Sequence, residues 1–343
     1  MQIQTNQLDA KDSQRIYLLG AWQRICLLMK GEFAPFLPSV LPSLLQMAAL
    51  NPEMGISGQD ALAELTDVLK EVTPAGAGEG EKGMNVVTDE IEEKDVALQM
   101  ISVFVDEVPE VCYDYLADLS KIVMSQTTYQ ANDSIRSTSA STLPGLMKCA
   151  KARNVDTQTL HQMAKEFNTN LYNAMKQELD TDTLTTQIQA FKDVIDEAGP
   201  GLMTQDEVKH IGDKSFDIIN KSLERITQNK NIPNEHEVED EDDALDADDL
   251  QLIEHENADE YDLQIAAAEL MGALFKTHRD FVGEVVQRLR GELIPACFAS
   301  NENKRFKFAL FILDDMVEHL GPTYFSPEDF STIVQAICGF CGH

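Results

Sequence analysis

The residues whose chemistry stands out most clearly form a run of carboxylates in the second half of the chain. From Glu235 to Asp262 there are 15 Asp and Glu residues and no Lys or Arg. Such a run resists folding, because its charges repel one another and it has few apolar groups to bury. It could attract a basic partner, or it could be a solvated linker. The candidate binding residues within it are Glu237, Glu239, Asp240, Glu241, Asp242 and Asp243.

A calcium site is a third interpretation of this run. The sequence DEDDALDADD lacks the central Gly and the terminal Glu that an EF-hand loop requires. We therefore do not expect a bound cation there.

A second set of carboxylates lies on predicted helices. Asp114 and Asp118 are four residues apart, as are Asp213 and Asp217, so each pair lies on one side of a helix, opposite an apolar stripe. Glu166 lies on the polar side of another helix. Each could be part of an ordinary solvated face, but together they predict an acidic inner surface that meets a basic protein.

Other residues with reactive side chains do not form a catalytic or metal site. Cys338, Cys341 and His343 would supply half of a zinc site, and no second Cys or His pair is placed to complete it. The phosphate-binding, dinucleotide-binding, nucleophile-elbow and zinc-protease motifs are all absent. We expect no enzymatic activity, no metal and no cofactor.

The elements that must position the carboxylates are helices. Apolar residues recur every three or four positions, as in Leu184, Ile188, Phe191 and Ile195, and no period-two alternation indicates a strand. The predicted helices come in pairs separated by short Gly, Pro, Asn or acidic junctions. These junctions centre on Gly31, Pro109, Asn154, Pro200, Asp280 and Pro322.

The spacing of these junctions predicts the fold. Neighbouring junctions are about 42–45 residues apart, as in HEAT-type repeats, except where a gap is longer by about 35 residues. We predict an all-α, right-handed superhelical solenoid of about six HEAT-type helix pairs over residues 1–343. Two inserted loops, 51–90 and 228–259, account for the longer gaps, and the second is acidic and predicted to be disordered. Apolar segments near both ends predict a fragment of a longer array.

The overall charge narrows the choice of partner. The chain has 27 basic and 59 acidic residues and a formal net charge of −32. A chain of this charge repels nucleic acids and anionic lipid, so we expect neither direct nucleic-acid binding nor membrane insertion. The six scattered cysteines do not form a disulfide framework, and the polar N-terminus does not read as a signal peptide.

Several segments resemble one family in both content and order. They are Tyr17–Glu53, Glu92–Glu110, Asp133–Ala150 and Phe308–Phe325, the last with the paired Asp314 and Asp315. The chain resembles the nuclear transport receptors of the importin-beta superfamily, most closely the karyopherin beta-3 branch. It looks like a piece from the middle of such a receptor, without the N-terminal repeats that make the main contact with Ran.

The resemblance implies a function and partners. Receptors of this kind shuttle between cytoplasm and nucleus, bind Phe-Gly nucleoporins, and carry basic cargo such as localisation signals, ribosomal proteins or histones. Cargo release is coupled to the Ran GTPase in the full-length receptor. Phe104, Phe191 and Phe275 lie on predicted first helices, where nucleoporins would bind, but we expect them to be core residues. A HEAT-repeat scaffold of the phosphatase-scaffold or condensin type, without Ran coupling, is the alternative.

Overall fold

The computed structural model describes residues 14–50, 79–230, 247–300 and 302–328, with 330, 331, 334, 335 and 338. All regular elements among these residues are helical, and none of them is a strand. The chain divides into two compact units, Met1–Asn154 and Val155–His343. Each unit is described separately below.

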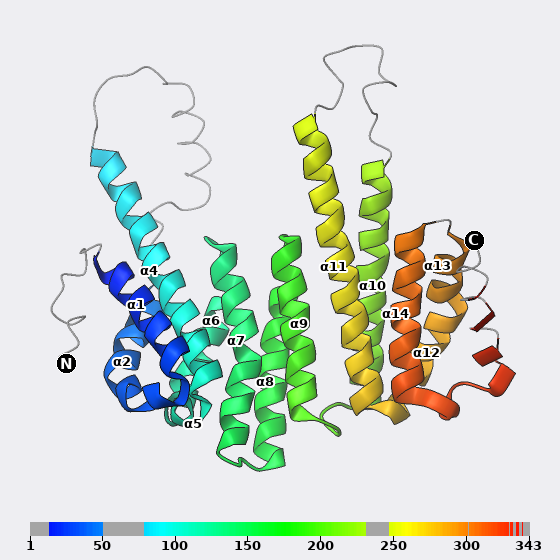
Figure 1. The fold of residues 1–343 in the computed structure, drawn as a ribbon, viewed down its shortest axis with the longest axis horizontal. Helices are drawn as coiled ribbons and strands as arrows, with labels where there is room; N and C mark the ends of the chain where they lie inside the picture. The colour runs from blue at the N-terminus through cyan, green and yellow to red at the C-terminus, as the bar shows by residue number, and fades with distance from the viewer. Residues whose placement is uncertain are drawn as a thin grey trace. The chain divides into compact units, whose positions relative to one another are not determined.

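The first unit is a stack of helices around the long helix α4. Helices α1 and α2 both pack against α4, α7 also packs against α4, and α6 packs against α7 (Figure 1). Consecutive helix pairs therefore share their apolar faces. The elements are α1 (Gln14–Met29), η2 (Lys30–Phe36), α2 (Leu37–Ala48), α4 (Glu79–Glu107), α5 (Pro109–Cys112), η3 (Tyr113–Tyr115), α6 (Leu116–Gln126) and α7 (Asp133–Ala152).

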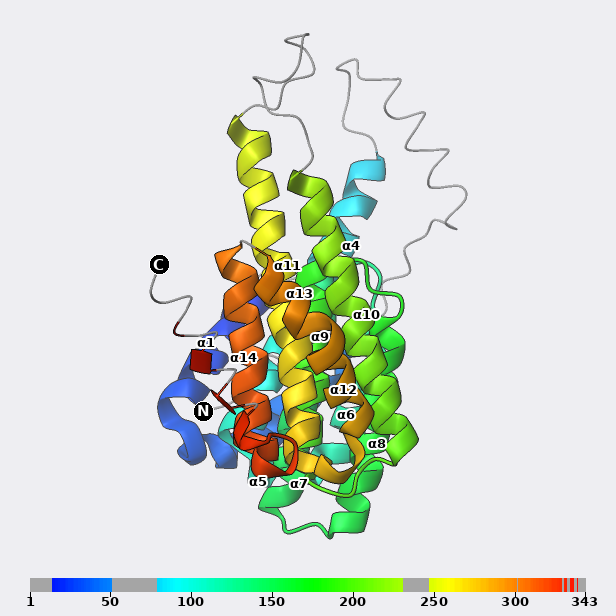
Figure 2. The ribbon, with the colours of Figure 1, turned by 90° about the vertical axis from the view of Figure 1, so that its right-hand side faces the viewer.

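The second unit has the same pattern in two layers. Helices α9, α11 and α14 lie side by side in one layer, and α8, α10 and α12 lie in the other (Figure 2). The elements are α8 (Thr157–Met175), α9 (Thr181–Ala198), α10 (Gln205–Lys230), α11 (Ala247–Thr277), η5 (Arg279–Phe281), α12 (Gly283–Arg288), the π-helical η6 (Leu289–Leu293), α13 (Ile294–Ala299), α14 (Asn303–Leu320) and η7 (Gly321–Thr323).

Local sequence signals set the ends of these helices. The side chains of Asn132, Asp156 and Asp180 each accept a hydrogen bond from the backbone N–H three residues on, at the starts of α7, α8 and α9. Helix α9 ends at Ala198, and the φ of +75° at the following Gly199 suits glycine. These caps set where α7, α8 and α9 begin and where α9 ends.

The buried residues confirm the predicted fold class. On α8 the stripe of Leu160, Ala164, Phe167, Leu171 and Ala174 is buried. The three phenylalanines that were expected to be core residues are also buried, with 0–2% of each exposed: Phe104, Phe191 and Phe275. Each helix thus buries one face against its neighbours, as a HEAT-type array requires.

The structure corrects the boundaries of both predicted inserts. Helix α4 begins at Glu79, α10 continues to Lys230, and α11 begins at Ala247. Residues 79–90, 228–230 and 247–259 are therefore helical rather than looped. Acidic residues near the N-terminus of α11 are compatible with the helix dipole, and this end of the helix packs along α10. Residues 51–78 and 231–246 lie outside the described residues.

Helices α10 and α11 extend together beyond the ends of α9 and α14 (Figure 1), and polar contacts join them. The Arg225 guanidinium forms two hydrogen bonds with the Glu260 carboxylate, one of them 2.8 Å long. The Ser222 hydroxyl donates to the Glu260 carbonyl at 3.0 Å and accepts from the Gln264 amide at 2.9 Å. We call Ser222, Arg225, Glu260 and Gln264 the hairpin clasp.

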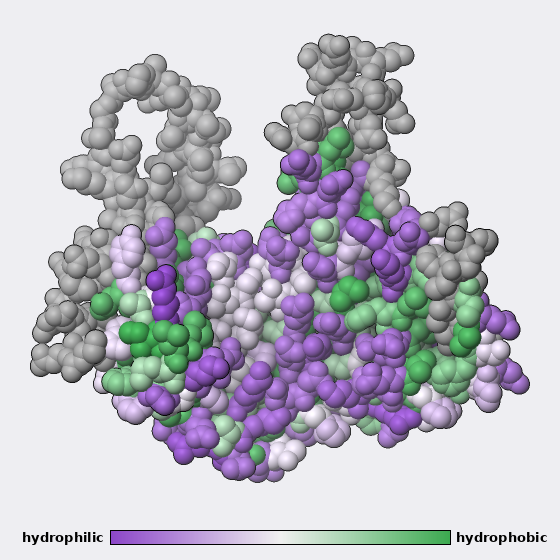
Figure 3. Space-filling view, viewed as in Figure 1, coloured by the Kyte–Doolittle hydropathy of each residue, from purple (hydrophilic) through white to green (hydrophobic). Residues whose placement is uncertain are grey.

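One stretch, Tyr17–Ala48, is long and apolar enough to cross a membrane on length and composition alone, although the sequence analysis expected no such segment. In the structure it consists of α1, η2 and α2, and both helices pack on α4. Its Trp22 and Phe33 are buried and their rings meet edge to face. These contacts favour the interpretation that Tyr17–Ala48 is a helix pair of the stack over the interpretation that it spans a membrane. Helix α1 exposes the side chains of Tyr17, Leu27 and Leu28. A hydrophobic area lies over α1 in Figure 3.

The hairpin clasp gives a stability prediction. Replacing Arg225 with Met should lower the free energy of unfolding by about 2 kcal/mol, because Glu260, only 5% exposed, would lose its charged partner. Chemical denaturation measures the difference. Lys221→Met on the exposed side of α10 is the matched control and should change little. Equal stability of the two variants would contradict a stabilising role for the clasp.

Candidate functional site

Helix α10, the second helix of the pair α9–α10, has a row of polar residues on one face. Asp206, His210, Asp213 and Asp217 are three or four residues apart, so they form a ridge along the helix. Helix α8 lies on one side of this ridge and α12 on the other (Figure 2). This ridge contains two of the carboxylates that the sequence analysis selected.

Both of those carboxylates have cationic partners within the chain. Asp213 is half-buried and pairs with Arg288 of α12 at 2.5 Å, and the Arg288 guanidinium lies 4.2 Å from the centre of the Phe216 ring. Asp217 is exposed and lies 3.4 Å from the Lys214 ammonium. Each of these two carboxylates therefore faces a cation, and the ridge has less free negative charge than the sequence suggests.

The close approach of α10 and α12 makes the Asp213–Arg288 pair possible. A Cβ atom on Gly212 would lie only 2.4 Å from a methyl group of Val285, so only glycine fits this contact without a shift. Lys209 of α10 also pairs with Glu284 of α12. A hollow of about 770 Å³ lies over these ion pairs, lined by Lys209, Asp213, Glu284, Val285, Gln287, Arg288 and Glu292.

The remaining selected helix carboxylates divide into paired and unpaired groups. Asp114 of η3 pairs with Arg153 at 2.7 Å, and the Arg153 Nε–H also donates to the Glu110 carbonyl at 3.0 Å. Asp118 of α6 and Glu166 of α8 are exposed, and neither forms an ion pair with another described residue. Asp118 and Glu166 are thus free to meet an external cation.

The acidic run itself is not placed by the structure. Glu237, Glu239, Asp240, Glu241, Asp242 and Asp243 lie outside the described residues, between the end of α10 at Lys230 and the start of α11 at Ala247. Cys338 is exposed, while Cys341 and His343 also lie outside them. Among the residues that the structure covers, no group of three or more His, Cys, Asp or Glu could hold a metal ion.

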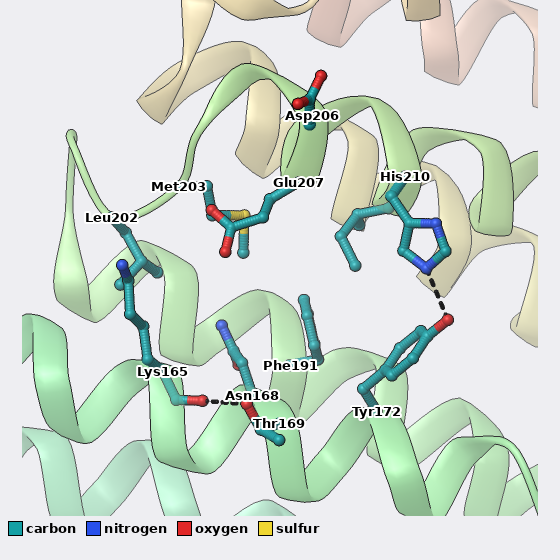
Figure 4. A pocket seen from close by; sticks show the side chains of 11 residues that line it. Lys165, Asn168, Thr169, Tyr172, Phe191, Leu202, Met203, Asp206, Glu207 and His210 are labelled. Atoms are coloured by element: carbon teal, nitrogen blue, oxygen red, sulfur yellow. Dashed lines mark hydrogen bonds between the residues drawn. The ribbon is translucent and has the colours of Figure 1, made fainter.

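The feature that the sequence analysis missed is a pocket between α8 and α10. Its volume is about 440 Å³, and the loop from Gly199 to Thr204 forms one of its walls (Figure 4). It is lined by Lys165, Asn168, Thr169, Tyr172, Phe191, Leu202, Met203, Asp206, Glu207, His210 and Ile211. We call it the Asn168 pocket.

Asn168 lies at the floor of this pocket. Only 6% of the residue is exposed, and neither its side-chain oxygen nor its nitrogen has a hydrogen-bond partner among the described residues. The side chain points from α8 into the space below α10 (Figure 4). Buried amides normally have partners, so this one is available for a ligand that both donates and accepts. A sequence signal existed: Asn168 interrupts the apolar stripe between Ala164 and Leu171.

Hydrogen bonds hold the loop wall of the pocket in place. The Thr204 N–H and hydroxyl both contact the Glu207 carboxylate, at 2.7 and 2.9 Å, in a capping box that starts α10. The Met203 N–H donates to Nε2 of His278 at 3.0 Å. Because Nε2 accepts, the proton of the neutral ring lies on Nδ1, which is 2.7 Å from the Thr277 hydroxyl. The pocket wall is therefore anchored to α11 and its following turn.

Two comparisons with known proteins now identify the architecture, whereas no family profile matches the sequence. Importin subunit beta-3 of Saccharomyces cerevisiae is 23% identical over 151 residues, which is 44% of this chain and 14% of that protein. The karyopherin Kap121p bound to the extreme C-terminus of the phosphatase Cdc14p matches 92% of this chain, with a TM-score of 0.68 and 17% identity. The fold is that of a karyopherin solenoid.

A second structure of Kap121p, bound to RanGTP, covers 96% of this chain with a TM-score of 0.60 and 16% identity. Others hold Pho4p or Nup53p. These matches confirm the HEAT-type fold and the resemblance to importin-beta receptors. The chain spans 14% of the curated relative and about a third of the Kap121p chains.

His278 gives a pH prediction. Burial lowers the pKa of His278, the neighbouring His161 lowers it further, and Glu207 opposes the shift. Because the unfolded chain takes up this proton more readily than the folded chain, stability should fall as the pH drops below about 6.5. His278→Gln, which keeps an acceptor for Met203, should remove part of that slope at a cost of about 1 kcal/mol.

The measurement is urea unfolding of each protein between pH 5 and 7.5. His255→Gln is the control, since the His255 side chain is 73% exposed. The same pH slope in His278→Gln as in the wild type would show that His278 does not carry the effect.

Proposed function

We propose that this chain is part of a nuclear import receptor, and that it contributes to binding basic cargo proteins. The supporting observation is the match of its fold to Kap121p over more than nine-tenths of its length. Kap121p has been solved with Cdc14p, Pho4p, Nup53p and RanGTP. By analogy, cargo proteins, Phe-Gly nucleoporins and, in the full-length receptor, Ran are the proposed partners, and shuttling between cytoplasm and nucleus is the proposed localisation.

The distribution of charge supports a basic partner. Several lysines and arginines on the second helices of the second unit already face carboxylates, as in the Lys209–Glu284 and Arg288–Asp213 pairs. The chain nevertheless has 32 more acidic than basic residues. The unpaired Asp118 and Glu166 and the carboxylates of 237–243 supply part of this excess. Long-range attraction then steers a cationic protein toward these surfaces.

The first test is binding of a fluorescent decalysine peptide. Changing Glu237, Glu239, Asp240, Glu241, Asp242 and Asp243 to their amides should weaken binding roughly tenfold at low salt and flatten its salt dependence. Asp118→Asn with Glu166→Gln should have a smaller effect in the same direction. Fluorescence anisotropy across a salt series measures both.

The control for the helix variant removes the same charge from a first helix. Asp314→Asn with Glu318→Gln changes two exposed residues of α14 and should leave decalysine binding close to that of the wild type. If all three variants bind decalysine equally, the chosen carboxylates do not form the cargo surface.

Coupling to Ran separates a transport receptor from a structural scaffold. We expect the full-length protein to be retained by Ran loaded with a non-hydrolysable GTP analogue and not by Ran loaded with GDP. Decalysine should be displaced when the GTP form binds. Equal retention by both forms would favour the scaffold.

A further inference from the structure

We propose that the Asn168 pocket binds an extended polypeptide segment, with the Asn168 amide pairing to one of its main-chain peptide groups. The inference deepens the proposed function and rests on it for the class of partner. It adds a specific contact in the second unit that does not depend on the charge of the partner.

The unpartnered amide is the first argument. An amide in water forms several hydrogen bonds, and burying it without replacements costs free energy. Asn168 loses nearly all of its contact with solvent, yet both polar atoms lack a partner in the described structure. The complement of a free N–H donor beside a free C=O acceptor is another amide, and a polypeptide presents one at every residue.

The walls of the pocket supply the second argument. Phe191 and Leu202 are buried beside the amide, and Ile211 and Met203 complete an apolar lining (Figure 4). A volume of about 440 Å³ is larger than one side chain fills, and it suits a short stretch of polypeptide with an aliphatic side chain. Burial of that side chain would add to the two hydrogen bonds.

The surroundings favour a long ligand over a compact one. The pocket opens beside the ridge of α10, and the hollow between α10 and α12 lies on the other side of the same helix. Asp206 and His210 line the pocket. Lys209 and Asp213, both within one turn of His210, line the hollow. A strand rises about 3.3 Å per residue, so a few residues would cross the ridge from one depression to the other.

Polar groups at the edge of the pocket would orient the segment. The Tyr172 hydroxyl and His210 Nε2 are 2.7 Å apart and bridge α8 and α10 at one end (Figure 4). Lys165 lies on α8, and Asp206 and Glu207 lie on α10, so the rim carries both signs of charge. A rim of both signs selects for charge placement in the ligand and not simply for a high positive charge.

The test uses a minimal peptide probe, N-acetyl-leucine N-methylamide, and the ¹⁵N-labelled chain. We expect the side-chain NH₂ signal of Asn168, assigned by its absence from the Asn168→Leu spectrum, to shift in a saturable way. The dissociation constant should be about millimolar for a ligand of this size. N-acetyl-leucine methyl ester, which lacks one N–H donor, should bind more weakly.

Two variants of Asn168 and one control variant show whether the Asn168 amide binds the probe. Asn168→Leu removes both polar atoms at similar volume and should be at least as stable as the wild type, since no buried hydrogen bond is lost. Asn168→Asp keeps the shape and removes the donor. Both should lower the affinity for the probe about tenfold or more. Asn173→Leu, at an exposed position of the same helix, is the matched control and should bind like the wild type.

Absence of a shift in the wild type, or equal affinity in all three variants, would overturn the proposal. The decalysine experiment separates this failure from failure of the proposed function. Decalysine binding without probe binding would leave the receptor function standing and reject the pocket. Probe binding at Asn168 without decalysine binding would support the pocket and count against a basic cargo.

Discussion

No helix pair of this chain can bury its apolar face alone, and this constraint shapes the rest of the molecule. In the first unit α4 is covered by α1, α2 and α7, and in the second α11 is covered by α9, α10 and α14. The buried stripes occupy one side of each helix, which leaves the opposite side free for polar residues. The surface available for binding is therefore a by-product of the stacking, and it repeats with the period of the stack.

Repetition also explains how charge is distributed. Ion pairs such as Asp213–Arg288 and Lys209–Glu284 join one second helix to the next, so some charges serve the stack instead of a partner. Exposed pairs of this kind contribute little stability individually, but they fix which carboxylates remain open. Asp118 and Glu166 are exposed and have no such partner among the described residues.

The fold could be predicted from the sequence because its determinants are local. The stripe from Leu160 to Ala174 and the caps at Asn132, Asp156 and Asp180 can all be read within a few residues. The partners of Asp114 and Asp213 could not, because Arg153 and Arg288 are 39 and 75 residues away along the chain. The sequence analysis missed Asn168 because the burial of its amide without a hydrogen-bond partner depends on α9, α10 and a loop together. The start of α11 was missed because its acidic composition resembles that of a linker, whereas α10 holds it in a helix.

The hairpin clasp has a consequence for any partner that the carboxylates of 237–243 attract. Arg225 and Glu260 join the two helices that flank this segment, so its two attachment points, Lys230 and Ala247, belong to one pair of packed helices. The segment is thus tethered at both ends to one support. For a partner bound to this segment, the effective concentration of the second unit would be high. A weak additional contact with the helices would then be enough to hold the partner in place.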